Sequence, residues 1–326
     1  MLGKPTRLSV WLALVLTAVA ATTWLIQPSR AAATPTIAFI PQTAGAMIWD
    51  VAHFGAQAAA EKIKCHLYWN APTSESDTAG QVSLIDKVGR GKYQGLVLAP
   101  NHTLGIRSPL TRALARGLPV VIVSADVDLP ASSNLAYIVN DDEKMGEFAA
   151  TEIARRIHGK GDIALIGLAR FAPGVTRRVR AAERLLASRY PDIHVVSRGL
   201  GTYINSRVEA LTNAALDSNP GLSAILSFTA VATRGVYSVL KSRALQPAVT
   251  LVGCDQDSDL IGYVESGEIA AIVAENTYRM GYEAVGLISD AWAGKPLPAR
   301  SLVAPLLITK QNLNSVEASV FTSFPK

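Results

Sequence analysis

Short apolar runs alternate with amphipathic helical segments along almost the whole chain. The apolar runs, each typical of a buried strand, cover residues 36–41, 65–70, 95–100, 119–125, 135–141, 162–168, 193–199, 223–228, 250–255 and 270–276. Segments such as "MIWDVAHFGAQAAAEKI" lie between most of them, with apolar residues at helical spacing. Continuous apolar strands joined by amphipathic helices predict an α/β protein whose parallel sheets are covered by helices on both faces.

Ten strands of this kind divide most simply into two α/β domains. The first series of strand and helix units closes near "YIVNDDEKMG", and the second begins at "GKGDIALIGL". The polar residues 140–144 between them predict the first crossing between domains. A chain of 326 residues with 49% hydrophobic content is long enough for two cores.

The N-terminal segment has the pattern of a secretory signal peptide. Lys4 and Arg7 precede an apolar run over residues 8–26, and three alanines occupy positions 31–33. We expect cleavage after Ala33 and a periplasmic mature protein. An uncleaved anchor is the alternative, because the apolar run is long for a signal. The alanines and the lack of a second spanning segment favour cleavage.

The basic charge of the chain belongs largely to this segment. Residues 1–33 contain Lys4, Arg7 and Arg30 and no acidic residue, so their removal lowers the formal net charge from +5 to +2. Nothing in the remaining sequence indicates a nucleic-acid surface. Cys65 and Cys254 lie far apart in sequence, and we expect two buried thiols in separate domains; a disulfide is the alternative in an exported protein.

Two carboxylates stand at the ends of predicted strands. Asp255 follows "TLVGC" and Glu275 follows "AAIVA". In parallel sheets the loops at the carboxyl ends of strands line the ligand crevice, so these two side chains are candidates for one binding edge. The loop "PQTAGAMIW" after the first strand and "SAD" after the fourth belong to the same class of position.

Motifs of the common enzyme classes are absent from the sequence. The stretch "GRGK" at 89–92 lacks the leading glycine and the following Ser or Thr of a phosphate loop, and no G-x-S-x-G elbow occurs. The five histidines show no H-x-x-x-H or H-E-x-x-H spacing, which argues against a metal site. "GLGTY" follows a strand but lacks the further glycine and acid of a dinucleotide site. The sequence therefore favours a binding protein that uses no cofactor or metal over an enzyme.

The order of several segments resembles a known family. "VTLVGCDQDSDLIGYVESGEIAAIVAENTYRMGYEAV", "MIWDVAHFGAQAAA", "GLVLAP", "YIVNDDEKMG" and "TRRVRAAERLL" are similar, in sequence and spacing, to segments of the periplasmic sugar-binding proteins of the ribose and galactose type. These are type I periplasmic binding proteins, which share their fold with the ligand domains of lactose-repressor-like regulators. The resemblance covers the chain from "TIAFIPQ" to "LLITK".

The resemblance implies two doubly wound parallel-sheet lobes joined by a three-strand hinge. The N-terminal lobe is expected to comprise residues 34–140 and 276–303, and the C-terminal lobe residues 141–275 and 304–326. The crossings would lie near 140–142, 274–276 and 303–305. In this family a ligand binds between the lobes and a hinge motion closes them.

Four candidate site residues follow from matching positions. Trp49 is similar to the family's aromatic that stacks on a sugar ring, the alternative being a core tryptophan near a helix start. Arg178 matches the arginine that forks to adjacent hydroxyls, with Arg177 as the alternative register. Asp255 matches an acceptor after a strand of the second lobe. Glu275 stands where the family usually has Gln at a hinge crossing.

Other positions match less closely. Tyr203 and Asn205 approach the place of a family aromatic. Ser124 stands where the family has an acid, and Asp126 is the next acid along the chain. Thr229 and Ala230 replace an Asn-Asp pair, and Ala46 replaces an Asn. An ionised Glu275 can accept hydrogen bonds but cannot donate them. The position is therefore also compatible with a ligand that carries a donor or a positive charge.

Two functions are compatible with these features. The first is a monomeric solute-binding protein that captures a sugar or polyol and delivers it to the permease of an ABC importer. The second is a sensor of the same fold that acts on a histidine kinase or chemoreceptor and binds a ligand other than a sugar. A repressor is excluded because a signal sequence stands where a helix-turn-helix domain would be.

Overall fold

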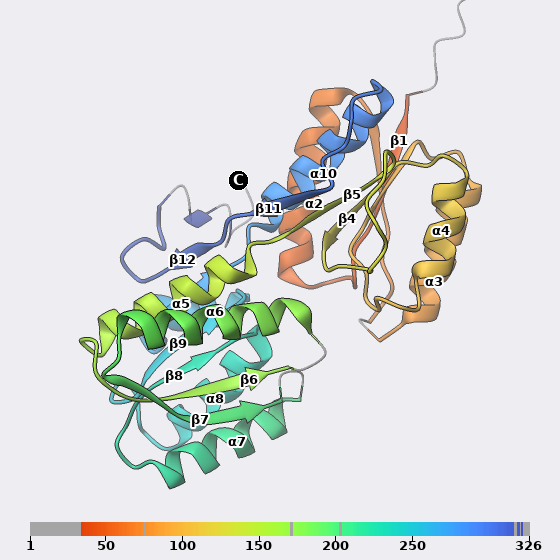
Figure 1. Cartoon of the computed structure of the whole chain (residues 1–326). Coiled ribbons are helices and arrows are strands. Elements are labelled where there is room, and N and C mark those ends of the chain that lie inside the picture. The colour runs from red at the N-terminus through yellow and green to blue at the C-terminus, as the bar shows by residue number, and fades with distance from the viewer. Residues whose placement is uncertain are drawn as a thin grey trace, which may run out of the picture. The chain divides into compact units, whose positions relative to one another are not determined.

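The computed structural model describes residues 34–74, 76–169, 172–201, 204–315, 318–319 and 321. It contains two α/β lobes, each built on a six-stranded sheet (Figure 1). The predicted signal peptide lies outside the described residues. Within the described ranges no helix is both long and apolar enough to span a bilayer.

The first sheet has the order β2-β1-β3-β4-β5-β11, and all its strands are parallel. Its strands are β1 (Thr36–Ile40), β2 (His66–Trp69), β3 (Gly95–Leu98), β4 (Val120–Ser124), β5 (Leu135–Asn140) and β11 (Arg300–Val303). The helices around it are α2 (Met47–Ile63), α3 (Thr78–Arg90), α4 (Arg107–Ala115) and α10 (Thr277–Trp292). Helices α2 and α10 share one apolar core with the sheet, and α3 and α4 share the other.

The second sheet repeats this arrangement in the order β7-β6-β8-β9-β10-β12. Its strands are β6 (Gly161–Leu168), β7 (Ile193–Leu200), β8 (Leu222–Ser227), β9 (Thr250–Cys254), β10 (Ala271–Ala274) and β12 (Leu306–Ile308), of which only β12 is antiparallel to its neighbour. Its helices are α5 (Asp142–Arg156), α6 (Pro173–Arg189), α7 (Asn205–Ser218), α8 (Ala230–Ser242) and α9 (Ser258–Ser266). Helices α5 and α6 lie side by side on one face (Figure 1), and α7, α8 and α9 pack on the other.

All ten predicted strands are present, with ends within two residues of the predicted ones. The predicted fold class is therefore confirmed. The short strands β11 and β12 were not predicted as strands, because Pro305 divides the run "SLVAPLLI" into two pieces at the sheet edges. In the described residues Cys65 and Cys254 are free, as expected, although Cys65 is only half-buried.

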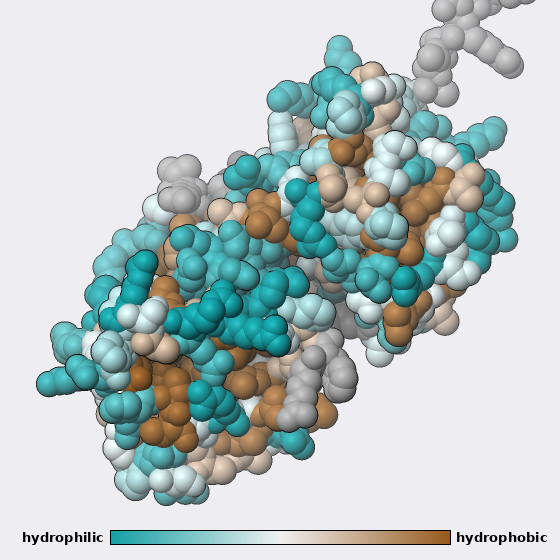
Figure 2. Space-filling model, in the orientation of Figure 1, coloured by the Kyte–Doolittle hydropathy of each residue, from teal (hydrophilic) through white to brown (hydrophobic). Residues whose placement is uncertain are grey.

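The chain passes between the two sheets three times in the described residues. The passages are β5 to α5, β10 to α10, and β11 to β12. They coincide with the segments that the family resemblance implied. The bounds of the two lobes remain a prediction. On the face shown in Figure 2, hydrophilic side chains cover much of the surface, and apolar ones form separate patches.

Helices α2 and α10 approach each other through glycines. A Cβ atom at Gly281 of α10 would lie 2.1 Å from the carbonyl oxygen of Ala52, and one at Gly55 of α2 would lie 2.0 Å from that of Tyr278. Backbone atoms cannot move aside as the end of a long side chain can. This pair of glycines therefore allows the close approach of α2 and α10.

We expect Gly281→Ala to destabilise the protein by about 2 kcal/mol, because the added methyl forces the two helices apart. Gly286 lies in the same helix with open space around its Cα, so Gly286→Ala is the matched control. It should raise the free energy of unfolding by about 0.5–1 kcal/mol through helix propensity. Urea unfolding of both variants measures this difference, and equal effects of the two substitutions would contradict the close-approach argument.

Candidate functional site

A crevice of about 620 Å³ lies at the carboxyl ends of strands from both sheets. This is where parallel α/β folds place ligands. Residues of the first lobe that line it include Gln42, Met47, Ile48, Asn101, His102, Ser124, Asp126 and Asn140. Residues of the second lobe include Asp142, Arg177, Arg178, Thr229, Arg234, Asp255, Asp257 and Glu275. The lining is rich in hydrogen-bonding and charged groups, so it suits a small polar ligand.

Arg178 is the central charged residue of this crevice. Its side chain is 6% exposed and forms ion pairs with three carboxylates. Nε donates to Asp142 Oδ1 at 2.9 Å, Nη1 to Asp255 Oδ1 at 2.6 Å, and Nη2 to Glu275 Oε1 at 2.6 Å. Nη1 also donates to the Phe228 carbonyl oxygen at 3.3 Å. One guanidinium thus connects the start of α5 with the ends of β8, β9 and β10.

The backbone around Arg178 is fitted to this role. A Cβ atom at Gly146 of α5 would lie 2.1 Å from the Arg178 carbonyl oxygen, so α5 and α6 are in close contact at this point. That contact brings Asp142, in the first turn of α5, within reach of the guanidinium. Arg177 adds a further ion pair, from Nη2 to Asp142 Oδ2 at 2.7 Å.

Burial and charge act in opposite directions on the pKa values of this cluster. Burial alone would lower the pKa of Arg178, but Asp255, Glu275 and Asp142 outweigh it and hold that pKa well above its ordinary value. Burial raises the pKa of Asp255 to about 7, because the attraction of Arg178 offsets only part of the desolvation. The cluster therefore exchanges a proton near neutral pH.

Two residues at this edge have left-handed backbones. Ser124 ends β4 with a φ of 68°, and Asp255 follows β9 with a φ of 65°. Residues other than glycine rarely adopt this conformation, and it tends to occur at functional sites. β4 and β9 occupy corresponding places in the two sheets, so each lobe turns its backbone sharply at the equivalent position.

Glu275 is fixed by Gln256. The Gln256 side chain donates to the Glu275 carbonyl oxygen at 2.7 Å and accepts from the Glu275 amide at 2.9 Å. Asn276 then caps α10 by accepting from the Arg279 amide at 2.9 Å. These bonds hold the backbone of Glu275 at the crossing into the first lobe, and the bond from Arg178 Nη2 positions its carboxylate.

Two further ion-pair groups border the crevice. Asp126 pairs with Arg300, whose guanidinium lies over the Tyr137 ring. Arg234 pairs with Asp257 and Asp259, each at 2.7 Å. Both groups are partly exposed, so they contribute little to stability.

The sequence matches the periplasmic binding protein domain family over residues 37–296. The chain belongs to this family. It is 27% identical to the D-allose-binding periplasmic protein of Escherichia coli (strain K12) over 255 residues, which are 74% of this chain and 81% of the relative. It is 24% identical to a xylitol-binding protein of Mycolicibacterium smegmatis over 86% of this chain and 81% of the relative.

Solved structures show the same fold. An arabinose binding protein from Geobacillus stearothermophilus superposes with a TM-score of 0.80 at 20% identity, over 86% of this chain and 98% of that one. Membership of this family confirms the prediction of a binding protein rather than an enzyme. Among the described residues no group of three or more His, Cys, Asp or Glu side chains could hold a metal ion.

Six of the nine predicted site residues line the crevice. They are Ser124, Asp126, Arg178, Thr229, Asp255 and Glu275. Their contact with a ligand remains a prediction. Protein acceptors occupy four of the five N–H groups of Arg178, and the forked contact to hydroxyls that the resemblance implied stays a prediction. In the structure Arg178 holds carboxylates in place.

Two predicted residues lie away from the crevice. Trp49 is 2% exposed and packs in the core between α2 and the first sheet, as the alternative interpretation stated. Successive helical residues point about 100° apart, so Met47 and Ile48 line the crevice and Trp49 points inward. Asn205 is exposed at the start of α7 and donates to Glu209 at 2.8 Å. Tyr203 lies outside the described residues.

Several crevice residues were not predicted. Asp142 is 5% exposed, and a second acid at the start of the helix after the crossing was its only sequence signal. Asn140 ends β5 and is also 5% exposed, and Asn101 follows β3 by three residues. The rule that strand ends line the crevice, applied to every strand, would have found both asparagines.

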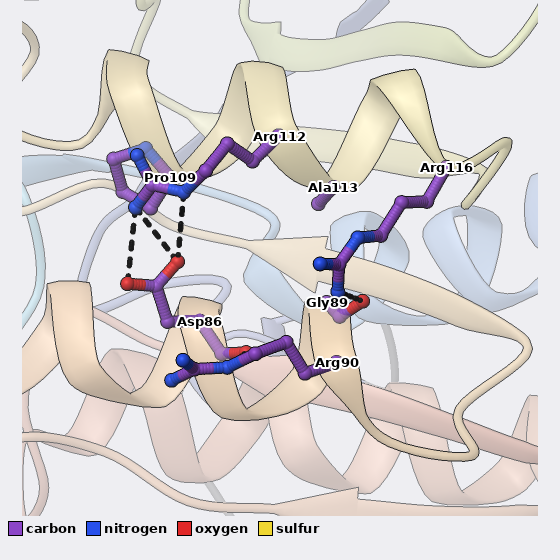
Figure 3. A pocket seen from close by; sticks show the side chains of 7 residues that line it. All are labelled: Asp86, Gly89, Arg90, Pro109, Arg112, Ala113 and Arg116. Atoms are coloured by element: carbon purple, nitrogen blue, oxygen red, sulfur yellow. Dashed lines mark hydrogen bonds and ion pairs between the residues drawn. The ribbon is translucent and has the colours of Figure 1, made fainter.

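A second, smaller cavity of about 200 Å³ lies between α3 and α4 (Figure 3). Its charged side chains are largely paired within the protein. Arg112 forms a bidentate pair with Asp86, and Arg116 donates to the Gly89 carbonyl oxygen. It lies away from the carboxyl ends of the strands, so it is the weaker candidate for a ligand site.

The raised pKa of Asp255 predicts a specific dependence of stability on pH. Because the folded pKa of about 7 exceeds the ordinary 3.8, the folded state retains a proton between these pH values that the unfolded chain releases. The contribution of Asp255 to stability should therefore fall as pH rises from 4 to 7, by at most ~1.4 kcal/mol per pH unit.

Urea unfolding of the wild type and Asp255→Asn between pH 4 and 9 measures this contribution. The difference in free energy of unfolding, wild type minus variant, should decrease up to pH 7 and then level off. A difference that stays constant or rises over this range would mean that Arg178 keeps Asp255 ionised in the folded protein.

Proposed function

We propose that this protein is a periplasmic solute-binding protein that captures a sugar or polyol in the crevice and delivers it to an ABC importer. The observation that carries the proposal is a crevice, in a chain of this family, whose polar lining comes from both lobes. The relatives named for D-allose and xylitol, and the solved arabinose binding protein, indicate this ligand class. We further propose that residues 1–33 are a cleaved signal peptide and that the mature protein is monomeric.

The lining suits a ligand with many hydroxyl groups. A sugar hydroxyl both donates and accepts, so its site needs acceptors and donors together. Asp126, Asp255 and Glu275 supply carboxylate oxygens, and Asn140 supplies an amide. The side chains of Met47 and Ile48 offer apolar surface for the ring or the carbon chain. Binding to groups of both lobes would favour a closed state over an open one, which is the form that an importer could recognise.

A thermal-shift screen of the chain from Thr34 onward tests the proposal. We expect at least one pentose, hexose or polyol to raise the melting temperature by several degrees at millimolar concentration, because a ligand that binds only the folded state stabilises it. Titration calorimetry on the compound that raises it most would give the affinity. If no sugar or polyol shifts the transition, the proposed ligand class is wrong.

Two asparagines provide a matched test of the site. Asn140 is nearly buried in the crevice lining, whereas Asn205 is exposed outside it. Asn140→Ala should weaken binding of the best sugar at least tenfold, because a buried polar group of the ligand loses its partner. Asn205→Ala should leave the affinity unchanged. Equal affinities for the two variants would place the ligand away from Asn140.

A further inference from the structure

Among the described residues, most of the hydrogen-bonding groups around Arg178 that have no protein partner are acceptors. Four of the five N–H groups of Arg178 have protein acceptors, so this residue has at most one to offer a ligand. Each of the three carboxylates that pair with Arg178 accepts its hydrogen bond through only one of its two oxygens. Asp142 directs its second oxygen to Arg177. Within the described part of the chain, Asp255 Oδ2 and Glu275 Oε2 accept no hydrogen bond.

Carboxylates also outnumber cations around the crevice. The lining residues and their ion-pair partners comprise four arginines, Arg177, Arg178, Arg234 and Arg300, and six carboxylates, Asp126, Asp142, Asp255, Asp257, Asp259 and Glu275. The central group around Arg178 carries three carboxylates against two arginines. Other titratable groups that face it are His102, in the lining, and the thiol of Cys254, whose pKa burial raises well above its ordinary value, so that it stays neutral.

The unbalanced charge lies in the buried part of the site. The side chains of Asp142, Arg178 and Glu275 are each less than a tenth exposed, and that of Asp255 is 24% exposed. An excess of negative charge in such surroundings is unfavourable unless a further cation or a proton balances it. A neutral hydroxyl donates a hydrogen bond to a carboxylate, but an ammonium group donates and also balances its charge.

We propose that the crevice prefers a ligand with a cationic ammonium group, an amino sugar or aminated polyol, to the neutral sugar or polyol of the same shape. This inference rests on the proposed function. The ammonium group would donate to Asp255 Oδ2 and Glu275 Oε2, the acceptors that Arg178 leaves free. The hydroxyl groups of the same ligand would bind the rest of the lining.

The ammonium group and a proton compete for the same carboxylates. With the pKa of Asp255 near 7, a proton occupies this group in part of the molecules at neutral pH and in most of them at pH 5.5. Binding of a cation should therefore release a proton and should weaken about tenfold from pH 7 to pH 5.5. Binding of a neutral polyol should not depend on the release of this proton.

Titration calorimetry with matched compounds tests the inference. The pairs are D-glucose and D-glucosamine, D-galactose and D-galactosamine, and sorbitol and 1-amino-1-deoxysorbitol, measured at pH 7, with the last pair also at pH 5.5. We expect the amino compound of at least one pair to bind at least tenfold more tightly than its neutral partner. Repeating the titration in buffers of different ionisation enthalpy counts the protons released.

The variant Glu275→Gln tests whether the preference for the amino compound arises in the crevice. It removes one negative charge while keeping the size of the side chain and an oxygen for Arg178, and the Gln256 contacts go to the backbone of residue 275. We expect this variant to reduce the ratio of amino to neutral affinity to about one. Glu265→Gln, on the exposed face of α9, removes the same charge outside the crevice and should leave the ratio unchanged.

The outcomes separate this inference from the proposed function. If a neutral compound binds as tightly as its amino partner in every pair, the preference for a cation is wrong and sugar binding stands. An amino preference that survives Glu275→Gln would contradict the assignment to this carboxylate. If neither the neutral nor the amino compounds bind, the proposed function fails and the inference fails with it.

Discussion

The arrangement of the second lobe depends on the hydrogen bonds and ion pairs of the Arg178 guanidinium. The guanidinium joins α5, α6 and the ends of three neighbouring strands, β8, β9 and β10, through charge-assisted hydrogen bonds. Removal of the arginine would leave three carboxylates facing one another with little solvent around two of them. Breaking a buried ion pair by removing one partner is strongly destabilising, typically by about 3–5 kcal/mol. The same residue that organises the crevice therefore also maintains the fold around it.

This arrangement gives the crevice its chemical character. A guanidinium whose N–H groups are bonded within the protein acts as a fixed support, and a ligand bound as proposed would meet the unused oxygens of its carboxylate partners. The position of Glu275, clamped by Gln256, and the left-handed backbone of Asp255 make these oxygens a preorganised surface. Preorganisation reduces the entropy lost on binding, so a small polar ligand can be held by few groups.

The sequence predicted the strands well and the individual contacts less well, for physical reasons. Strands buried on both faces form continuous apolar runs, and their ends follow from those runs, so Asp255 and Glu275 could be assigned to one edge. Trp49 could not be assigned, because a shift of one position around a helix exchanges a crevice-facing residue for a core residue. The pairing of Arg178 with Asp142 depends on how closely α5 and α6 approach at Gly146. The distance between these two helices cannot be predicted from a local sequence pattern.

The three crossings between the sheets are very short. One residue separates β5 from α5, two separate β10 from α10, and two separate β11 from β12, one of which is Pro305 with a fixed φ. Any rotation of one lobe against the other is absorbed by this handful of backbone torsions, which restricts it to a narrow path. Glu275 is one of these few residues. A positive charge bound to its carboxylate, as proposed, would therefore act at a crossing between the lobes, where a small change in torsion would be amplified over the full length of a lobe.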